Sequence, residues 1–409
     1  MEKKLLRGCK VFLGIVFLTL LLVESALSMP PRFLFLFIGD GMGENDVQLL
    51  KAYQESRGLV SAFSALPYAG VVGTTSLGEI PDSASSGTAL ACGVKTRNGT
   101  VGLDPSGRTV PSIAEIAKRQ GFRVGIVTNV AINDATPASF YAHRSSRRDY
   151  SGIAFDMVES GFDLFVGWGI ASPGNALTLA RERGYTVIRS WDDFLSHKEL
   201  PLIALLSFPF RIDQKEGYTL KDAVRRGIDL LSNDRGFFLL VEGGKIDWCK
   251  HMNDVGTLLF ELLDFDEAIQ EALSFAHRYP QETLILVTAD HETGGLGVGV
   301  DVNFLGILSQ SFSYQIFLDK VSSGVSLPEL AREMWPLGEF SDFQVPTGDV
   351  NKTFVALARA FSRKVGISWE TTGHTGKNVP VFLWGQPEPS CIFQDNTDVF
   401  KILKDCLKR

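Results

Sequence analysis

The chain has 409 residues, of which 45% are hydrophobic and 21% are charged. These fractions are ordinary for a globular protein and exclude a disordered tail, a collagen-like fibre and a coiled coil. The net charge is −7, with 40 Lys plus Arg against 47 Asp plus Glu, and no basic run stands out, so we expect no nucleic-acid partner. The length allows one large α/β domain or two smaller ones.

The first residues predict an export signal. A mostly basic start precedes an uninterrupted apolar run at 11–23, and a small-residue stretch after it fits a signal-peptidase site. The run is shorter than the roughly 20 residues that a membrane-spanning helix needs. We therefore predict a signal peptide at 1–28 and an exported mature chain at 29–409, periplasmic or extracellular, with no stable membrane span. The alternative is an uncleaved anchor whose longer, tilted helix begins near Gly8.

Four cysteines remain after the leader. Export permits disulfides. Cys391 and Cys406 lie close in the sequence, and we expect them to pair, which would add about 3 kcal/mol of stability in the chain-entropy model. We expect Cys92 and Cys249 to be buried thiols.

Short apolar runs alternate with amphipathic segments along the mature chain. The predicted strands are Phe33–Ile38, Arg123–Thr128, Phe162–Val166, Phe237–Val241, Thr283–Thr288 and Val379–Trp384. The predicted helices are Ser112–Gln120, Asn175–Arg183, Thr219–Ser232 and Gly256–Arg278. Strands that are apolar on both faces and separated by helices indicate an α/β fold, with a largely parallel central sheet covered by helices on both faces.

The predicted helices carry boundary and surface signals. Two of them open with the spacing of a capping box, Ser112-x-x-Glu115 and Thr219-x-x-Asp222. In the last helix, we interpret Asp264, Asp266 and Glu267 as part of its solvated face.

Residues 297–345 differ from the rest of the chain. Gly, Ser and isolated aromatic residues dominate there, and the periodicity is weak. We interpret this segment as a small insertion over or beside the sheet, within a single domain of residues 29–409.

Acidic and histidine side chains gather just after the predicted strands. The strand ends are followed by Asp40, Asp134, Glu242, Asp247, Asp290 and His291. In a parallel sheet, ligands bind at the carboxyl ends of the strands. Four strand ends would therefore direct carboxylates or imidazoles to one edge of the sheet.

Several of these residues have the spacing of metal ligands. Asp247 and His251 are four residues apart, so that they share one face of a helical turn. Asp290 and His291 are adjacent at a strand end, and His374 lies between glycines that allow a close backbone approach. Mixed histidine and carboxylate ligands suit zinc.

An all-oxygen set suits magnesium, with water completing the shell. Asp40, Thr136 and Glu242 could form such a set. Taken singly, each candidate has an ordinary interpretation, since a lone Asp after a strand is usually a cap or turn residue. Their joint occurrence after successive strands is what favours a metal site.

The nucleophile candidate is Ser83, within Asp82-Ser83-Ala84-Ser85-Ser86. Small residues follow it, which is consistent with a tightly packed helix that begins at Ser83. The positive end of a helix dipole favours an oxyanion and binds phosphate. The alternative is an N-cap serine with no chemistry. A lipase-type triad is disfavoured, because the segment is not a Gly-x-Ser-x-Gly elbow.

At six separated motifs, the sequence resembles the alkaline phosphatase family, from about residue 33 to 385. The motifs are Ile38-Gly39-Asp40-Gly41-Met42-Gly43, Asp82-Ser83-Ala84, Asp134-Ala135-Thr136-Pro137-Ala138, Val241-Glu242-Gly243 through Asp247-x-x-x-His251, Thr288-Ala289-Asp290-His291-Glu292-Thr293-Gly294-Gly295 and Gly373-His374-Thr375-Gly376. They occur in the family's order, which makes chance similarity negligible.

The resemblance implies a fold, a reaction and a set of roles. The fold would be alkaline-phosphatase-like, and the enzyme would hydrolyse small phosphate monoesters through a phosphoserine formed at Ser83. The implied ligands are Asp40, Asp290 and His291 for one zinc, Asp247, His251 and His374 for a second zinc, and Asp40, Thr136 and Glu242 for one magnesium, with Asp134 orienting its waters. Arg147 matches the phosphate-binding arginine, with Arg144 and Arg148 as neighbours. Dimers are usual in the family, so a homodimer is an expectation.

Other readings of the same residues stay open at this point. Trp248 departs from family members with a charged or imidazole group there, which puts the pH optimum and the rate of phosphate release in doubt. A phosphodiesterase, a sulfatase or a cofactor-independent mutase would be a related enzyme, but no sulfatase motif occurs and Thr136, Glu242 and Arg147 favour monoesters. A binding module without turnover would not need Ser83.

Overall fold

The computed structural model describes residues 30–407 apart from 215, 337–348 and 386–392. The predicted leader at 1–28 and Cys391 lie outside the described residues. Within the described part of the chain, no helix combines the length and the apolarity that crossing a bilayer requires.

A nine-stranded sheet runs through the molecule in the order β2-β13-β8-β1-β7-β3-β4-β6-β5. Its strands are β1 Phe33–Gly39, β2 Tyr68–Val72, β3 Arg123–Thr128, β4 Leu164–Gly167, β5 Thr186–Ile188, β6 Leu202–Leu205, β7 Phe237–Gly243, β8 Thr283–Thr288 and β13 Val379–Gly385. Only β13 runs antiparallel to its neighbours in this sheet. The predicted α/β class with a largely parallel sheet is confirmed.

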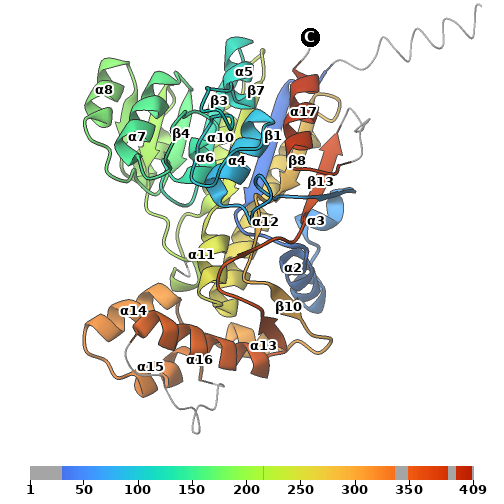
Figure 1. The fold of residues 1–409 in the computed structure, drawn as a ribbon, viewed down its shortest axis with the longest axis vertical. Helices are drawn as coiled ribbons and strands as arrows, with labels where there is room; N and C mark the ends of the chain where they lie inside the picture. Colours follow the sequence, from blue (N-terminus) through green and yellow to red (C-terminus); the bar gives the residue numbers. More distant parts are fainter. Residues whose placement is uncertain (1–29, 215, 337–348, 386–392, 408–409) are drawn as a thin grey trace, which may run out of the picture.

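Helices cover both faces of this sheet (Figure 1). The helices are α2 Glu44–Ser56, α3 Ala62–Ala65, α4 Ser83–Cys92, α5 Ile113–Arg119, α6 Ala135–Ala138, α7 Tyr150–Glu159, α8 Ala176–Glu182, α9 Trp191–Ser196, the 3-10 turn η1 Arg211–Asp213, α10 Leu220–Leu231, α11 Lys245–His251, α12 Val255–Ala276 and α17 Thr397–Cys406. The long helices α10 and α12 pack on each other and on the sheet, and α5 and α6 contact the sheet in one layer with α4 and α17.

The central strands are apolar throughout because they are covered on both sides. Every residue of β1 and β7 is buried. Ile38 of β1 is in register with Glu242 of β7 and with Thr288 of β8. Since neighbouring parallel strands end at the same level, the residues that follow β1, β7 and β8 emerge together at one edge.

A helical lobe extends from one end of the sheet domain (Figure 1). It contains α13 Phe304–Leu308, α14 Tyr314–Ser322, α15 Leu327–Met334 and α16 Val350–Lys364. Two short antiparallel pairs, β10 Leu296–Val298 with β11 Ile367–Trp369 and β9 Glu292–Thr293 with β12 His374–Thr375, lie where the chain leaves and re-enters the main domain.

The expected insertion at 297–345 contains three of these helices, whereas α16 follows it and packs against α14. The weak periodicity has a physical reason, because the helices are short and several serines serve as caps. Ser313, for example, caps α14 by accepting a hydrogen bond from the Ile316 N–H.

The prediction that Asp264, Asp266 and Glu267 belong to a solvated face of α12 is wrong for the two aspartates. Asp264 and Asp266 are buried, at 5% and 4% exposure. Asp264 pairs with Arg211 at 3.3 Å, and Asp266 accepts a hydrogen bond from the Gln54 side chain at 2.9 Å. Other elements cover α12 from several sides, so its acidic side chains need buried partners; Glu267 alone of the three stays partly exposed.

The predictions for the cysteines are confirmed at two positions and wrong at a third. Cys92 and Cys249 are buried free thiols, as predicted. Cys406 is also a buried free thiol, on the inner side of α17, so the structure does not contain the expected disulfide at that residue. Its proposed partner, Cys391, lies outside the described residues.

The capping box at the start of α5 gives a test of the fold. The Glu115 N–H donates to Ser112 Oγ at 3.1 Å, and the Ser112 N–H donates to Glu115 Oε2 at 2.7 Å. The buried Ser112 hydroxyl also donates to the Phe140 carbonyl. We expect Ser112→Ala to lower the free energy of unfolding by about 1–2 kcal/mol, measured by urea denaturation.

The matched control is Ser326→Ala, at the exposed N-cap of α15. Its side chain makes no capping hydrogen bond, so the expected loss is below about 0.5 kcal/mol. Equal losses in the two variants would contradict this account of the Ser112 cap.

Candidate active site

The carboxyl edge of the sheet gathers the residues that the sequence singled out. Asp40 follows β1, Glu242 lies near the end of β7, and Asp290 and His291 follow β8. The other candidates come from neighbouring elements: Ser83 from α4, Thr136 from α6, Asp247 and His251 from α11, and His374 from β12. Chain segments that are far apart in sequence therefore supply a single cluster, as the strand-end pattern predicted.

Two groups of side chains have the spacing of metal sites. The ligand atoms of Asp40, Asp290 and His291 lie within 4.8 Å of one another, and so do those of Asp247, His291 and His374. His291 belongs to both groups, so the two sites would be adjacent.

The remaining candidate ligands lie against these groups. His251 Nε2 is 3.1 Å from Asp247 Oδ2. Thr136 Oγ1 is 3.3 Å from Asp40 Oδ2, and Thr128 Oγ1 donates to the Glu242 carboxylate. The oxygen set predicted for magnesium thus borders the Asp40 side of the cluster.

Two of the three histidines are oriented by backbone carbonyls at Nδ1. His251 Nδ1 is 2.6 Å from the Thr372 carbonyl oxygen, and His374 Nδ1 is 2.7 Å from that of Pro81. A carbonyl accepts only from a protonated nitrogen, so each Nε2 is left as the free ligand atom. The rings of His291 and His374 stack at 3.6 Å. Burial, together with the charge of His374, lowers the pKa of His291 well below its usual value, which favours the neutral, metal-binding form.

The carboxylates form an excess of buried negative charge. Burial, and then the charges of Asp290 and Asp247, raise the pKa of Asp40 well above its usual value. Burial also raises the pKa of Asp290 to about 7, although the Gly41 N–H donates to it. Among the described residues, Asp40 Oδ1 is buried with no hydrogen-bond partner. An unpartnered buried oxygen beside the imidazole of His291, whose lowered pKa favours its neutral form, fits a site built for cations.

Gly41 allows the loop after β1 to pass through the cluster. Its φ is +71°, a conformation that side chains other than glycine rarely adopt. A Cβ there would lie 2.7 Å from Asp247 Oδ1 and 2.9 Å from Thr293 Oγ1. Thr293 Oγ1 in turn donates to Asp247 Oδ1 at 2.6 Å. The glycine of the Gly39-Asp40-Gly41 motif is therefore a packing requirement of the site.

Ser83 and Arg147 lie beside the cluster. Ser83 Oγ is 3.3 Å from His291 Nε2, at the first residue of α4. The guanidinium of Arg147 bridges Asp82 and Asp134, with a nitrogen–oxygen distance of 3.2 Å to each. Arg144 instead pairs with Asp156, and Arg148 pairs with no acidic side chain among the described residues, so Arg147 is the arginine at the site.

Asp82 is a residue whose role the sequence did not reveal. It caps α4 by accepting a hydrogen bond from the Ser85 N–H at 3.0 Å, and it accepts another from the Gly99 N–H. Burial alone would raise the pKa of Asp82, but these hydrogen bonds and the charge of Arg147 outweigh it and lower that pKa. Asp82 therefore stays ionised and holds Arg147 next to Ser83; its position directly before Ser83 was the available signal.

Lys250 is a second residue that the sequence analysis missed. Its ammonium group is fully buried between Asp46 of α2 and Glu292 of β9. Glu292 also accepts a hydrogen bond from the Thr375 hydroxyl of β12. This buried ion network ties together the helix that carries His251, the segment after His291 and the strand that carries His374. A lysine between two candidate ligands was the only signal in the sequence.

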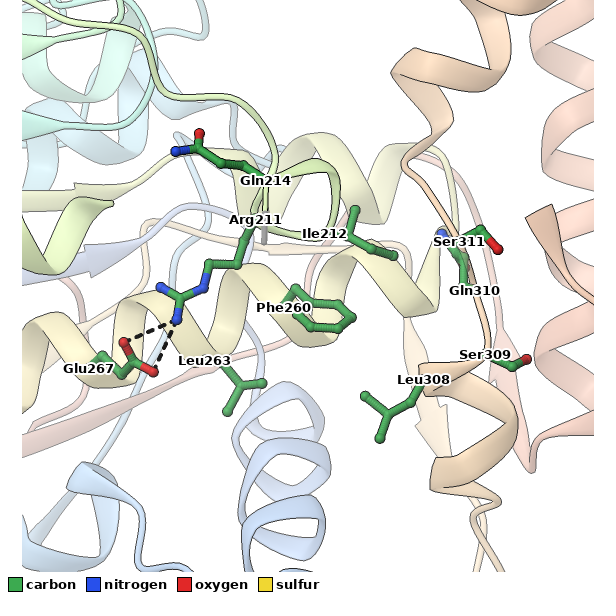
Figure 2. Close-up of a pocket in the computed structure, with 10 residues that line it drawn as sticks. All are labelled: Arg211, Ile212, Gln214, Phe260, Leu263, Glu267, Leu308, Ser309, Gln310 and Ser311. Atoms are coloured by element: carbon green, nitrogen blue, oxygen red, sulfur yellow. Dashed lines mark hydrogen bonds and ion pairs between the residues drawn. The ribbon is translucent and has the colours of Figure 1, made fainter. Parts of the chain in front are cut away.

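A cavity of about 490 Å³ lies elsewhere, between η1, α12 and the end of α13. Figure 2 shows Arg211 turned towards Glu267, with Phe260 and Leu308 bordering the same space. None of the residues that line it is a candidate ligand, so this cavity is separate from the carboxylate and histidine cluster.

Known proteins of one family resemble the chain in sequence and structure. The family model for alkaline phosphatase matches residues 32–163 and 180–409. Alkaline phosphatase 4 of Bacillus subtilis is 32% identical over an alignment of 362 residues, with 80% of this chain and 77% of that protein covered. The alkaline phosphatase of Escherichia coli is 29% identical over 358 residues, with 71% of this chain and 76% of that protein covered.

Solved structures of alkaline phosphatases also resemble the chain. A cold-active alkaline phosphatase from a psychrophilic Shewanella species has a TM-score of 0.82 at 28% identity, covering 92% of this chain and all of that one. The alkaline phosphatase of Thermus thermophilus has a TM-score of 0.80 at 26% identity, covering 93% of this chain and 92% of that one.

The fold and these relatives define the chain as a hydrolase of phosphate monoesters. It belongs to the alkaline phosphatase family.

The close packing at Gly41 leads to a test of the site. We expect Gly41→Ala to reduce bound metal and kcat/KM by about tenfold or more, because the new methyl group displaces Asp247 and Thr293. The control is Gly58→Ala, with a similar φ of +68° but no atom within 4 Å of the added Cβ. It measures backbone strain alone, so equal effects of the two substitutions on metal content would refute the packing argument.

The buried carboxylates predict how the metal-free protein responds to pH. The folded-state pKa of Asp290, about 7, exceeds its ordinary value of 3.8, so its contribution to stability is present at low pH and is lost as pH rises through 7. We expect the melting temperature of the chelated protein to fall between about pH 5 and about pH 8, and added zinc to restore it most at the higher pH.

The control for this prediction is Asp290→Asn, which removes the titrating group. It should reduce the pH dependence of the melting temperature in the chelated protein, and Asp40 and Glu242, whose pKa values are also raised, account for the part that remains. Asp247 titrates below the range tested, because its hydrogen bond and ion pair with His251 outweigh burial and lower its pKa. A slope of the same size in Asp290→Asn would exclude Asp290 as the source.

Proposed function

We propose that this chain is an exported alkaline phosphatase that hydrolyses phosphate monoesters through a phosphoserine at Ser83 and releases inorganic phosphate. The observation that supports this most directly is the 3.3 Å separation of Ser83 Oγ from His291 Nε2, the imidazole shared by both ligand groups. A hydroxyl is thereby placed against the paired ligand groups, with Arg147 close by.

The proposed cofactors are two zinc ions and one magnesium ion. Asp40, Asp290 and His291 would hold one zinc; Asp247, His251 and His374 would hold the other; and Asp40, Thr136 and Glu242 would hold magnesium, with Asp134 orienting its waters. When bound, the cations supply positive charge to the attacking oxygen, the leaving oxygen and the phosphoryl group. The mixed donors of the first two sets suit zinc, and the oxygen donors of the third suit magnesium.

Ser83 is proposed to act as the nucleophile. Its oxygen forms a bond to phosphorus while the bond from phosphorus to the alcohol oxygen breaks, and the alcohol leaves with a proton. Water then cleaves the phosphoserine and returns Ser83 to its starting state. Because Ser83 is the first residue of α4, the positive end of the helix dipole also favours its anionic form.

Arg147 is proposed to bind two phosphate oxygens through its planar guanidinium. Its two ion pairs with Asp82 and Asp134 hold the group in place before the substrate arrives, so less side-chain entropy is lost on binding. The presence of Arg147, Thr136 and Glu242 together supports monoesters rather than diesters as substrates. The leader that the sequence predicts at 1–28 supports export, and a homodimer stays an expectation from the family.

The nucleophile assignment has a direct test. We expect Ser83→Ala to lower kcat for p-nitrophenyl phosphate by about 1,000-fold or more, because the covalent route is lost. Metal analysis should still find about two zinc and one magnesium per chain, since the serine is not counted among the buried donors.

The matched control is Ser85→Ala, two residues further along the same helix. Ser85 Oγ bonds to the Asp82 carbonyl and to Asn98, away from the ligand groups, so most of the turnover should remain. Full activity in Ser83→Ala would rule out the phosphoserine, and loss of zinc in that variant would show that the change disturbed the site rather than the nucleophile.

A further inference from the structure

An exposed tryptophan lies against α11, the helix that carries Asp247 and His251. Trp168, directly after β4, is 43% exposed. Its ring centroid is 6.0 Å from that of Trp248 on α11, and Trp248 is 6.4 Å from Phe210. Neither the candidate ligand sets nor the proposed phosphate contacts use these side chains.

The loop that carries Trp168 is fixed next to the catalytic segment. The Trp168 N–H donates to the Val130 carbonyl at 2.7 Å. Two further hydrogen bonds of 2.7 Å join the Asn133 side chain to the backbone of Ala171. Since Asn133 directly precedes Asp134, which holds Arg147, the indole is positioned by the same chain segment that positions the arginine.

One face of the Trp168 indole is covered by the buried side chain of Lys245. Lys245 Nζ lies 5.0 Å from the centroid of Trp168 and 4.8 Å from that of Phe210. Lys245 is only 1% exposed, so it occupies the inner side of the aromatic group. The exposed area of Trp168 is therefore on its remaining face and edges, where a planar ring could stack.

We propose that Trp168, supported by Trp248, stacks against an aromatic ring carried by the leaving group of the phosphate monoester. This inference rests on the proposed function and assigns the set Asp247, His251 and His374 to the leaving oxygen, because Ser83 lies against His291 of the other set. Trp248 lies on α11, the helix that also carries Asp247 and His251, so the aromatic pair is attached to the element that supplies two of these three residues. The fixed loop makes the stack favourable, because little side-chain entropy is lost on binding.

The test compares three substrates in the metal-loaded enzyme. Phenyl phosphate places a ring next to the leaving oxygen, adenosine 5′-monophosphate places one a sugar away, and glycerol phosphate has none. The quantity compared is kcat/KM for phenyl phosphate or the nucleotide, whichever the unaltered enzyme prefers, divided by kcat/KM for glycerol phosphate. We expect Trp168→Ala to lower this ratio about tenfold and Trp168→Phe to keep most of the ratio. The control Phe155→Ala, at an exposed aromatic residue on α7, should leave the ratio unchanged.

A binding measurement separates stacking from turnover. In the Ser83→Ala background, equilibrium dialysis should show that Trp168→Ala weakens binding of phenyl phosphate or of the nucleotide about tenfold relative to glycerol phosphate. Equal losses for all three ligands would assign Trp168 a structural role and overturn the inference, as would unchanged ratios for both aromatic substrates. If the unaltered enzyme hydrolyses none of the three, the proposed function itself fails.

Discussion

The repulsion among buried carboxylates at one edge of the sheet is the constraint on which the rest of the structure depends. Asp40, Asp290 and Glu242 are buried, and all three have raised pKa values because burial and their neighbours disfavour the charged forms. A fold with no use for this arrangement would gain stability by replacing them with apolar side chains. The cost is offset when cations bind, which couples the stability of this edge to metal content.

The surroundings of the cluster serve to hold its members in position. The Nδ1 contacts of His251 and His374 aim their other nitrogens at the carboxylates. The buried Lys250 network joins the segments that carry these histidines. A buried ion network of this kind contributes little net stability, but removal of one partner leaves an uncompensated charge, so it favours one arrangement of the three segments over others.

The helical lobe and the aromatic pair Trp168 and Trp248 lie outside the edge of the sheet that carries the candidate ligands. The lobe is inserted between β10 and β11, close to the strands that carry Thr293 and His374, so its attachment borders the site without supplying a candidate ligand. Trp168 and Trp248 form an aromatic pair at α11, the helix that carries Asp247. The candidate site is therefore built by the sheet edge, while loops and the insertion lie around it, as is usual where specificity varies on a common scaffold.

The sequence by itself determined the α/β class, the central strands and the capping box at Ser112, because these follow from local apolar periodicity and short-range hydrogen bonding. It also identified the residues that gather at the carboxyl edge, since strand ends in a parallel sheet must meet there. Only the tertiary structure decided that Asp264 and Asp266 are buried, that Cys406 is a free thiol, and that Asp82 and Lys250 support the site. Burial and pairing over long sequence separations depend on which segments pack together, and no local pattern in the chain records that.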